Sequence, residues 1–154
     1  MSFRRVGRLG TAGALAAAAF GASVVFTPSS ASAAVDWQCH GTAVKRCAAV
    51  YWDRTADTYA ARAKIIDVAG GGSYQVKVTN VKLRRFNGDG FITVRSADDY
   101  DGWHGTRDSA GTTAVDPCRW PTNSFVVVAT FNWRGASTGQ ETWKPNMSWG
   151  HACN

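Results

Sequence analysis

The chain has 154 residues, of which 45% are hydrophobic and 12% aromatic, and it carries a formal net charge of +6. Three of its 17 basic residues lie before residue 34, where no acidic residue occurs, so the remainder has a net charge of only +3. This length favours one domain over two, and a charge this small lacks the strongly basic footprint of a nucleic-acid-binding protein.

Residues 1–33 are predicted to be a signal peptide. They begin with the basic residues Arg4, Arg5 and Arg8. An uncharged, Ala-rich run follows from Thr11 to Phe26, and Ala31-Ser32-Ala33 fits cleavage by signal peptidase. The apolar run is short for a bilayer span and no comparable run follows, so we expect no membrane span. Export by the general secretory route then leaves residues 34–154 as a single secreted domain.

The four cysteines all lie after residue 33, and an even number in an exported chain indicates two disulfides. We expect Cys39 to pair with Cys47 and Cys118 with Cys153, because each bond then closes a local segment; the two other pairings stay open. The chain-entropy contribution is about 2.6 kcal/mol for the first loop and about 3.8 kcal/mol for the second. No Cys-x-x-Cys pair is present, which disfavours a zinc site, and we predict no bound metal.

The first strand is expected over residues 43–52. Residues 57–68 allow two interpretations: a strand in which Tyr59, Ala61 and Ala63 alternate, or a helix capped by Asp57. The Gly-rich segment at 70–73 resembles a hairpin loop, so we favour the strand.

A longer strand is predicted over residues 74–86. Its apolar side chains change parity near Asn80, which predicts a β-bulge. The sequence Asn87-Gly88-Asp89-Gly90 is a strong turn signal, so residues 91–94 form the second strand of a hairpin.

Residues 96–120 are expected to be one long, polar connection, a feature that is usually functional or mobile. Phe125 to Trp133 follows as the central strand, because one of its faces is apolar throughout. A turn at 135–139 and a short strand at 140–144 complete the pattern. We predict an all-β fold, an antiparallel β-sandwich (Ig-like) or an open barrel with two disulfides.

This layout resembles that of small secreted proteins of high-GC Gram-positive bacteria. The similarity rests on the order of the segments VYWDRTADTYAARAKIID, YQVKVTNVKLRRFNGDGFITV, DDYDGWHG, PCRW and VVVATFNWRG. It covers nearly all of the chain after residue 33. The resemblance implies an extracellular location and a class that includes protease inhibitors and non-enzymatic subunits, among them adaptors of secreted toxin particles. It carries over no functional residue.

His104 is the candidate for acid–base chemistry, because Asp99, Asp101 and Asp108 are close in sequence and could orient it. Ser109 is nearby, but the chain has no Gly-x-Ser-x-Gly or His-Glu-x-x-His motif. A chain with a single glutamate is also poorly supplied for paired-carboxylate catalysis. We therefore predict a protein that is not an enzyme and needs no cofactor.

The same acidic residues suggest a calcium loop, since Asp99, Asp101 and Asp108 match three ligand positions of one. Ala97 stands where the first carboxylate belongs. An Asp-rich turn is therefore the preferred interpretation.

Basic residues offer a candidate binding surface. Lys82 and Arg84 are expected on the outer face of their strand, as is Lys77, and Arg85 and Arg95 lie near the hairpin turn. Such a surface could dock an acidic protein or an anionic polymer, or it could be a solvated sheet face. Nucleic acid is not expected, because stacking aromatics do not alternate with these cations.

Tryptophans fall into two groups. Trp52 and Trp133 lie in strands and are expected in the core. Others lie in loops, near turns or in the tail, where they could cover the core or contact a sugar or a protein: Trp103, Trp120, Trp143 and Trp149.

The sequence therefore predicts a domain that works by binding. The leading hypothesis is an adaptor subunit of an extracellular assembly, such as an antibacterial toxin complex, that meets a secreted protein partner through residues 96–120, with Trp103 and His104. One alternative is a carbohydrate-binding module, recognised by coplanar exposed tryptophans. Another is a protease inhibitor that presents Arg119 between Cys118 and Trp120, and a small hydrolase built on His104 is the last.

Overall fold

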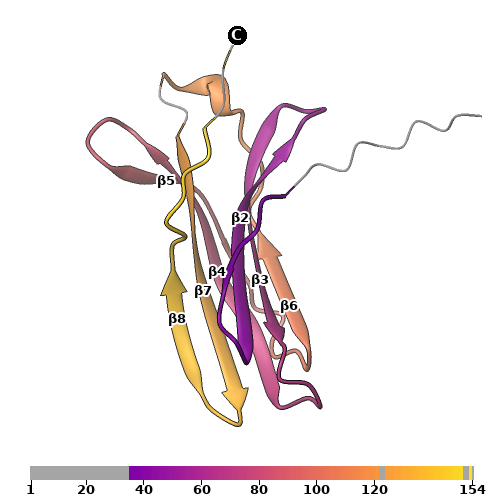
Figure 1. Ribbon diagram of the computed structural model, residues 1–154. Coiled ribbons are helices and arrows are strands. Elements are labelled where there is room, and N and C mark those ends of the chain that lie inside the picture. Colours follow the sequence, from indigo (N-terminus) through magenta and orange to yellow (C-terminus); the bar gives the residue numbers. More distant parts are fainter. Residues whose placement is uncertain (1–34, 122–123, 151–152, 154) are drawn as a thin grey trace, which may run out of the picture. The chain divides into compact units, whose positions relative to one another are not determined.

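Two antiparallel four-stranded sheets pack face to face as a β-sandwich (Figure 1). The computed structural model describes residues 35–121, 124–150 and 153, so the predicted signal peptide lies outside the described residues. The first sheet contains, in spatial order, β1 (Gln38–His40), β2 (Val44–Asp53), β3 (Thr58–Asp67) and β6 (Arg107–Gly111). The second sheet contains β5 (Phe91–Asp98), β4 (Tyr74–Phe86), β7 (Phe125–Gly135) and β8 (Gly139–Trp143). The predicted all-β sandwich is confirmed.

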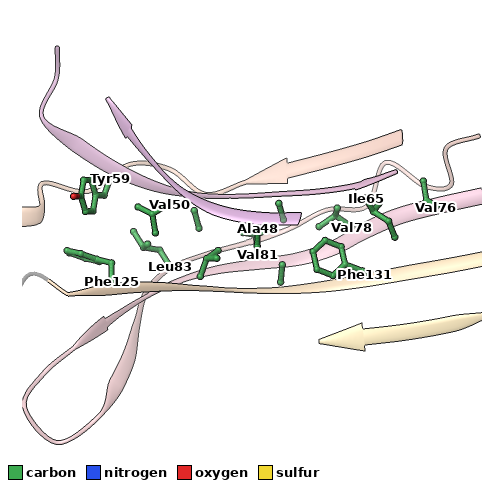
Figure 2. Close-up of a cluster of buried hydrophobic side chains, with 14 of the residues drawn as sticks. Ala48, Val50, Tyr59, Ile65, Val76, Val78, Val81, Leu83, Phe125 and Phe131 are labelled. Atoms are coloured by element: carbon green, nitrogen blue, oxygen red, sulfur yellow. The ribbon is translucent and has the colours of Figure 1, made fainter. Parts of the chain in front are cut away.

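The core lies between the sheets and is made by alternate residues of the long strands (Figure 2). Both sheets contribute side chains, among them Ala48, Val50, Tyr59 and Ile65 of the first and Val76, Val81, Leu83, Phe125 and Phe131 of the second. The inward residues of β7 are fully buried, and Trp133 at its end is half-buried. The predicted central strand therefore does lie inside a sheet, between β4 and β8.

Residues 57–68 are a strand, as favoured from the sequence. In β3, Tyr59, Ala61 and Ile65 face the core. Asp57, the cap of the alternative helix, instead has a φ of 49° and lies in the turn between β2 and β3. The period of two prevails because it buries this row of side chains against the second sheet.

The predicted bulge is present in β4. Its pairing with β7 shifts between Val78 and Asn80, which leaves Thr79 as the extra residue. Val76 and Val78 before the shift and Val81 after it are all buried. The carbonyl oxygen of Thr79 accepts a hydrogen bond from the amide of Asp99 (3.1 Å), so the bulge also anchors the chain that leaves β5.

The expectation of one irregular connection over residues 96–120 is wrong. This stretch holds the end of β5, strand β6 and a 3₁₀ turn, η1 (Pro117–Arg119). The sequence of β6, RDSAG, has no apolar alternation, and it is extended because it pairs with the edge of β3. β1 was likewise not foreseen; its three residues are held to β2.

The predicted disulfide pairing is confirmed. Cys39–Cys47 joins β1 to β2, and Cys118–Cys153 joins η1 to the C-terminal tail. Among the described residues, no helix is long and apolar enough to cross a membrane.

Candidate functional site

The chain passes from the second sheet to the first through residues 99–106, which we call the crossover segment. Its backbone continues the edge of the second sheet beyond the end of β5. The amide of His104 donates to the carbonyl of Val76 (3.0 Å), and the amide of Val76 donates to the carbonyl of His104 (2.8 Å). Together with the bond from Asp99 to Thr79, this pair fixes both ends of the segment to β4.

Trp103 lies between two cations at this edge. The ammonium of Lys77 lies 4.6 Å from its ring centroid, and the guanidinium carbon of Arg134 lies 4.4 Å from it. The Nε of Arg134 donates to Oε1 of Gln75 (2.7 Å), which holds the guanidinium in place. The indole is half-buried, and contacts of this kind favour a fixed ring orientation.

A carboxylate–imidazole–carboxylate cluster follows directly. Nε2 of His104 lies 3.1 Å from Oδ1 of Asp101 and 3.8 Å from Oδ1 of Asp108. Asp108 is 6% exposed, and its Oδ2 accepts from the amide of Val78 (2.6 Å) while its Oδ1 accepts from that of Ser109. Asp108 belongs to the first sheet and Val78 to the second, so this side chain ties the two sheets together.

The hydrogen bond between His104 and Asp101 favours the charged form of both residues. The hydrogen bond that His104 donates to Asp101, aided by the charges of Asp108 and Asp99, raises the pKa of His104, although burial opposes this. The same hydrogen bond lowers the pKa of Asp101. Burial and the neighbouring carboxylates raise the pKa of Asp99. The carboxylates of Asp101 and Asp108 therefore favour the protonated form of His104 over the neutral form.

The side chains that could hold a metal ion are those of Asp101, His104 and Asp108, since their ligand atoms lie within 4.8 Å of one another. The geometry differs from the calcium loop considered from the sequence. Oδ1 of Asp99 accepts from the amide of Asp101 (3.2 Å), as in an Asp-rich turn. The imidazole of His104 lies between the carboxylates of Asp101 and Asp108. Because calcium prefers oxygen ligands, this arrangement does not favour a calcium site.

Tyr100 is the residue of this region that sequence reasoning missed. Its side chain is 88% exposed, the most of any large apolar residue in the described ranges. It sits between Asp99 and Asp101, on a segment whose two ends are fixed to β4. A lone aromatic among aspartates gave no periodic signal in the sequence.

The predicted residues Arg119 and Trp120 lie elsewhere. Arg119 lies over Trp120, and Trp120 adjoins Phe125. Phe125 pairs with Arg85 near one end of β4, whereas the crossover segment is bonded to Val76 near the other end. Arg119 is exposed in η1, whose start is capped by Oδ1 of Asp116 accepting from the amide of Cys118 (2.7 Å). Trp120 is half-buried against the core.

The predicted basic surface is divided between two faces. Lys82 and Arg84 point outward from β4, and Arg84 donates to the carbonyl of Phe91. Arg85 has inward parity, is 8% exposed and stacks over Trp120, with 5.0 Å between its guanidinium carbon and the ring centroid. These two arginines therefore cannot belong to one exposed stripe.

Arg95 also departs from the outward row, because it pairs with the inward residue Leu83. Its guanidinium donates to the carbonyl of Val94 (2.9 Å). Of the five basic residues singled out from the sequence for this surface, Lys77, Lys82 and Arg84 have outward parity.

All seven tryptophans are half-buried, and cations or a histidine lie over most of their rings. Those with such a neighbour are Trp37, Trp52, Trp103, Trp120, Trp133 and Trp143. A sugar-binding platform needs free, coplanar indole faces, which this arrangement does not favour.

A second polar cluster spans the open edge between the sheets. Oε2 of Glu141 in β8 lies 3.1 Å from the guanidinium of Arg46 and 3.4 Å from Nε2 of His40. Arg46 lies over Trp133 (4.8 Å to the ring centroid) and lines a cavity of about 230 Å³ with Tyr74. These residues are far apart in the chain, so only the fold brings them together.

Comparison with known proteins finds no family model that matches this chain, and no curated protein is significantly similar to it in sequence.

Proposed function

We propose that this protein is a secreted, non-enzymatic binding domain that serves as an adaptor subunit of an extracellular assembly. The observation that carries the proposal is Tyr100, whose side chain is 88% exposed at the crossover segment. Folding gains nothing from an aromatic side chain in water. Exposed tyrosines are, however, typical anchor residues of protein interfaces.

The crossover segment is also suited to binding because it is held in one conformation. The backbone pair of His104 with Val76, the bond from Asp99 to Thr79 and the ion pair of His104 with Asp101 fix the residues around Tyr100. A pre-organised loop loses little conformational entropy on binding, so more of the contact energy contributes to affinity.

Hydrolysis is a weaker proposal for the same residues. Nε2 of His104 faces two carboxylates, and no hydroxyl in the described part of the chain hydrogen-bonds to its side chain. The raised pKa of His104 works against a base at neutral pH.

An extracellular location agrees with a disulfide-bonded β-domain. Secretion through a signal peptide at residues 1–33 is part of the proposal, as is a toxin complex as the assembly, which rests on the resemblance described above.

Affinity purification from the culture medium of the producing organism tests the proposal. The tagged full-length chain is expressed as wild type, Y100A and M147A, the last removing another exposed apolar side chain on the C-terminal tail. We expect a stoichiometric secreted protein to co-purify with wild type and M147A, and its yield to fall at least about tenfold with Y100A. A protein that elutes alone and monomeric, or a partner retained by Y100A, would show the proposal to be wrong.

Protease inhibition is a second candidate, favoured by the exposure of Arg119 beside the Cys118–Cys153 disulfide. A trypsin-like protease would accept the Arg119 side chain in its acidic pocket. Inhibition assays against a trypsin-like protease with wild type and R119A test this, and equal residual protease activity with both would dismiss it.

A further inference from the structure

The outer face of the first sheet carries four basic side chains that the sequence did not single out. Alternate residues of β2 and β3 face the core, among them Val44, Ala48, Ala63 and Ile65. The intervening positions therefore point outward. We call the outward cations of this sheet the cationic face; they are Lys45, Arg62, Lys64 and Arg107.

These cations are neighbours across three strands. Lys45 of β2 and Arg107 of β6 both pair with Ile66 of β3, one from each side, and Lys64 is two residues from Ile66. Adjacent strands lie about 4.8 Å apart and alternate residues about 6.7 Å apart, so three charges surround one position. Burial, followed by the charges of Arg107 and Lys45, lowers the pKa of Lys64.

No carboxylate among the described residues forms an ion pair with these cations. The outward carboxylate of β2, Asp53, lies at the strand's end and accepts from the amides of Thr55 and Ala56. Crowded, unpaired cations on a rigid sheet attract an external anion.

The residues around the cationic face indicate which class of anionic partner it could bind. The exposed large apolar residues, which would anchor a protein, all lie outside β2, β3 and β6: Val68, Ile92, Tyr100 and Met147. The aromatic rings beside the cationic face are covered, since Lys64 lies 4.1 Å from the ring centroid of Trp37 and Arg62 lies 5.6 Å from that of Tyr51. A ring with a cation over one of its faces is a poorer stacking platform for nucleic-acid bases than a free ring.

We propose that the cationic face binds a linear phosphate polymer without bases, recognised through its repeated negative charge. Lysine serves as a point charge for phosphate, and the arginines add paired hydrogen bonds. An open sheet face suits a flexible polymer that is read by charge rather than by shape. The cationic face does not include Tyr100, so this proposal can hold whether or not the adaptor proposal holds.

Binding of inorganic polyphosphate to the full-length chain tests the proposal by titration calorimetry at several salt concentrations. The variant K45Q/K64Q removes two charges from the cationic face. The matched control K82Q/K144Q removes two lysines from the second sheet and its adjoining tail, and so has the same net charge. Thermal melts of each protein establish that it is folded.

We expect polyphosphate to bind K45Q/K64Q about tenfold more weakly at low salt, and the slope of log K against log salt to fall by about 1.5. The control should stay within about twofold of wild type. Equal weakening in both variants would mean that only net charge matters and would overturn the assignment. Tighter binding of polyglutamate or of single-stranded DNA at equal charge would overturn it as well, in favour of an acidic protein or a nucleic acid.

Discussion

Asp108 is the side chain on which the geometry of the crossover depends. It leaves β6 in the first sheet, yet its carboxylate accepts from the amide of Val78 in the second and lies beside His104. A nearly buried carboxylate that accepts two backbone amides is a strong acceptor, and its loss leaves a buried donor unpaired.

The variant D108N should therefore destabilise the fold by about 1–3 kcal/mol, because the amide nitrogen of asparagine cannot accept a hydrogen bond. Urea unfolding followed by tryptophan fluorescence measures this. D89N, in the exposed hairpin turn, is the matched control and should change stability by less than about 0.5 kcal/mol. Similar midpoints for the two variants would contradict this role of Asp108.

His104 should make stability depend on pH. Its folded-state pKa lies above the unfolded value of 6.5. The imidazolium therefore stabilises the fold fully below pH 6.5, and this contribution is lost as the pH rises through the folded-state pKa. The melting temperature of wild type relative to H104Q should thus fall between pH 6 and pH 9. Taking the difference removes the effect of His40, whose pKa is shifted downward by burial.

At the scale of residues, the sequence predicted which residues belong to a cluster better than it predicted which partners they contact. His104 and two nearby aspartates were correctly suspected of interacting, because they are close in the chain. The alternation of apolar residues after the bulge also predicts the inward direction of Arg85, which the predicted basic surface did not take into account. The cluster of Arg46 with Glu141 was not accessible, since nothing local relates them.

At the scale of elements, strands with a strong apolar period were predictable and those without it were not. The bounds of β4 agree with prediction, and β3 and β7 agree within two residues at each end. β6 is polar and short, and its extended conformation comes from the neighbouring strand β3. A strand of this kind is specified by tertiary pairing, which no local pattern records.

Glycine is required for different reasons at two turns, at Gly135 and at Gly88. Gly135 has a φ of 140°, and a Cβ there would lie 2.1 Å from the carbonyl oxygen of Ser73. Gly88, in the β4–β5 turn, has a φ of 107°, but a Cβ there would meet no atom within 4 Å. Both positions disfavour a side chain through φ, and only Gly135 adds a backbone clash.

Comparing G135A with G88A isolates that clash. G88A should cost about 1 kcal/mol, from backbone strain alone, whereas G135A should cost about 3 kcal/mol or more. Thermal and urea unfolding of the two variants measure the difference. Equal losses would mean that Ser73 can move aside freely.

At the scale of the molecule, the two disulfides act on different parts of the sandwich. Cys39–Cys47 ties an edge strand to its neighbour across a separation of 8 residues, and Cys118–Cys153 encloses β7 and β8 across 35. The longer loop restricts the unfolded chain more.

Replacing each pair by alanine should therefore have unequal effects. The variant C118A/C153A should lose about 3.8 kcal/mol of unfolding free energy and C39A/C47A about 2.6 kcal/mol. Urea titration of both against wild type under oxidising conditions gives the two values. A larger loss for C39A/C47A would mean that contacts of β1, rather than loop entropy, dominate.

The same two bonds set an order of events in time. Cys39 and Cys47 can meet as soon as the first hairpin has formed, since closing so short a loop requires no other strand. Cys118 must wait for Cys153, which emerges only after β7 and β8 have followed. Oxidation of Cys118 therefore marks the moment at which the sandwich is complete. Alkylation of free thiols during oxidative refolding would trap molecules with only the first bond formed.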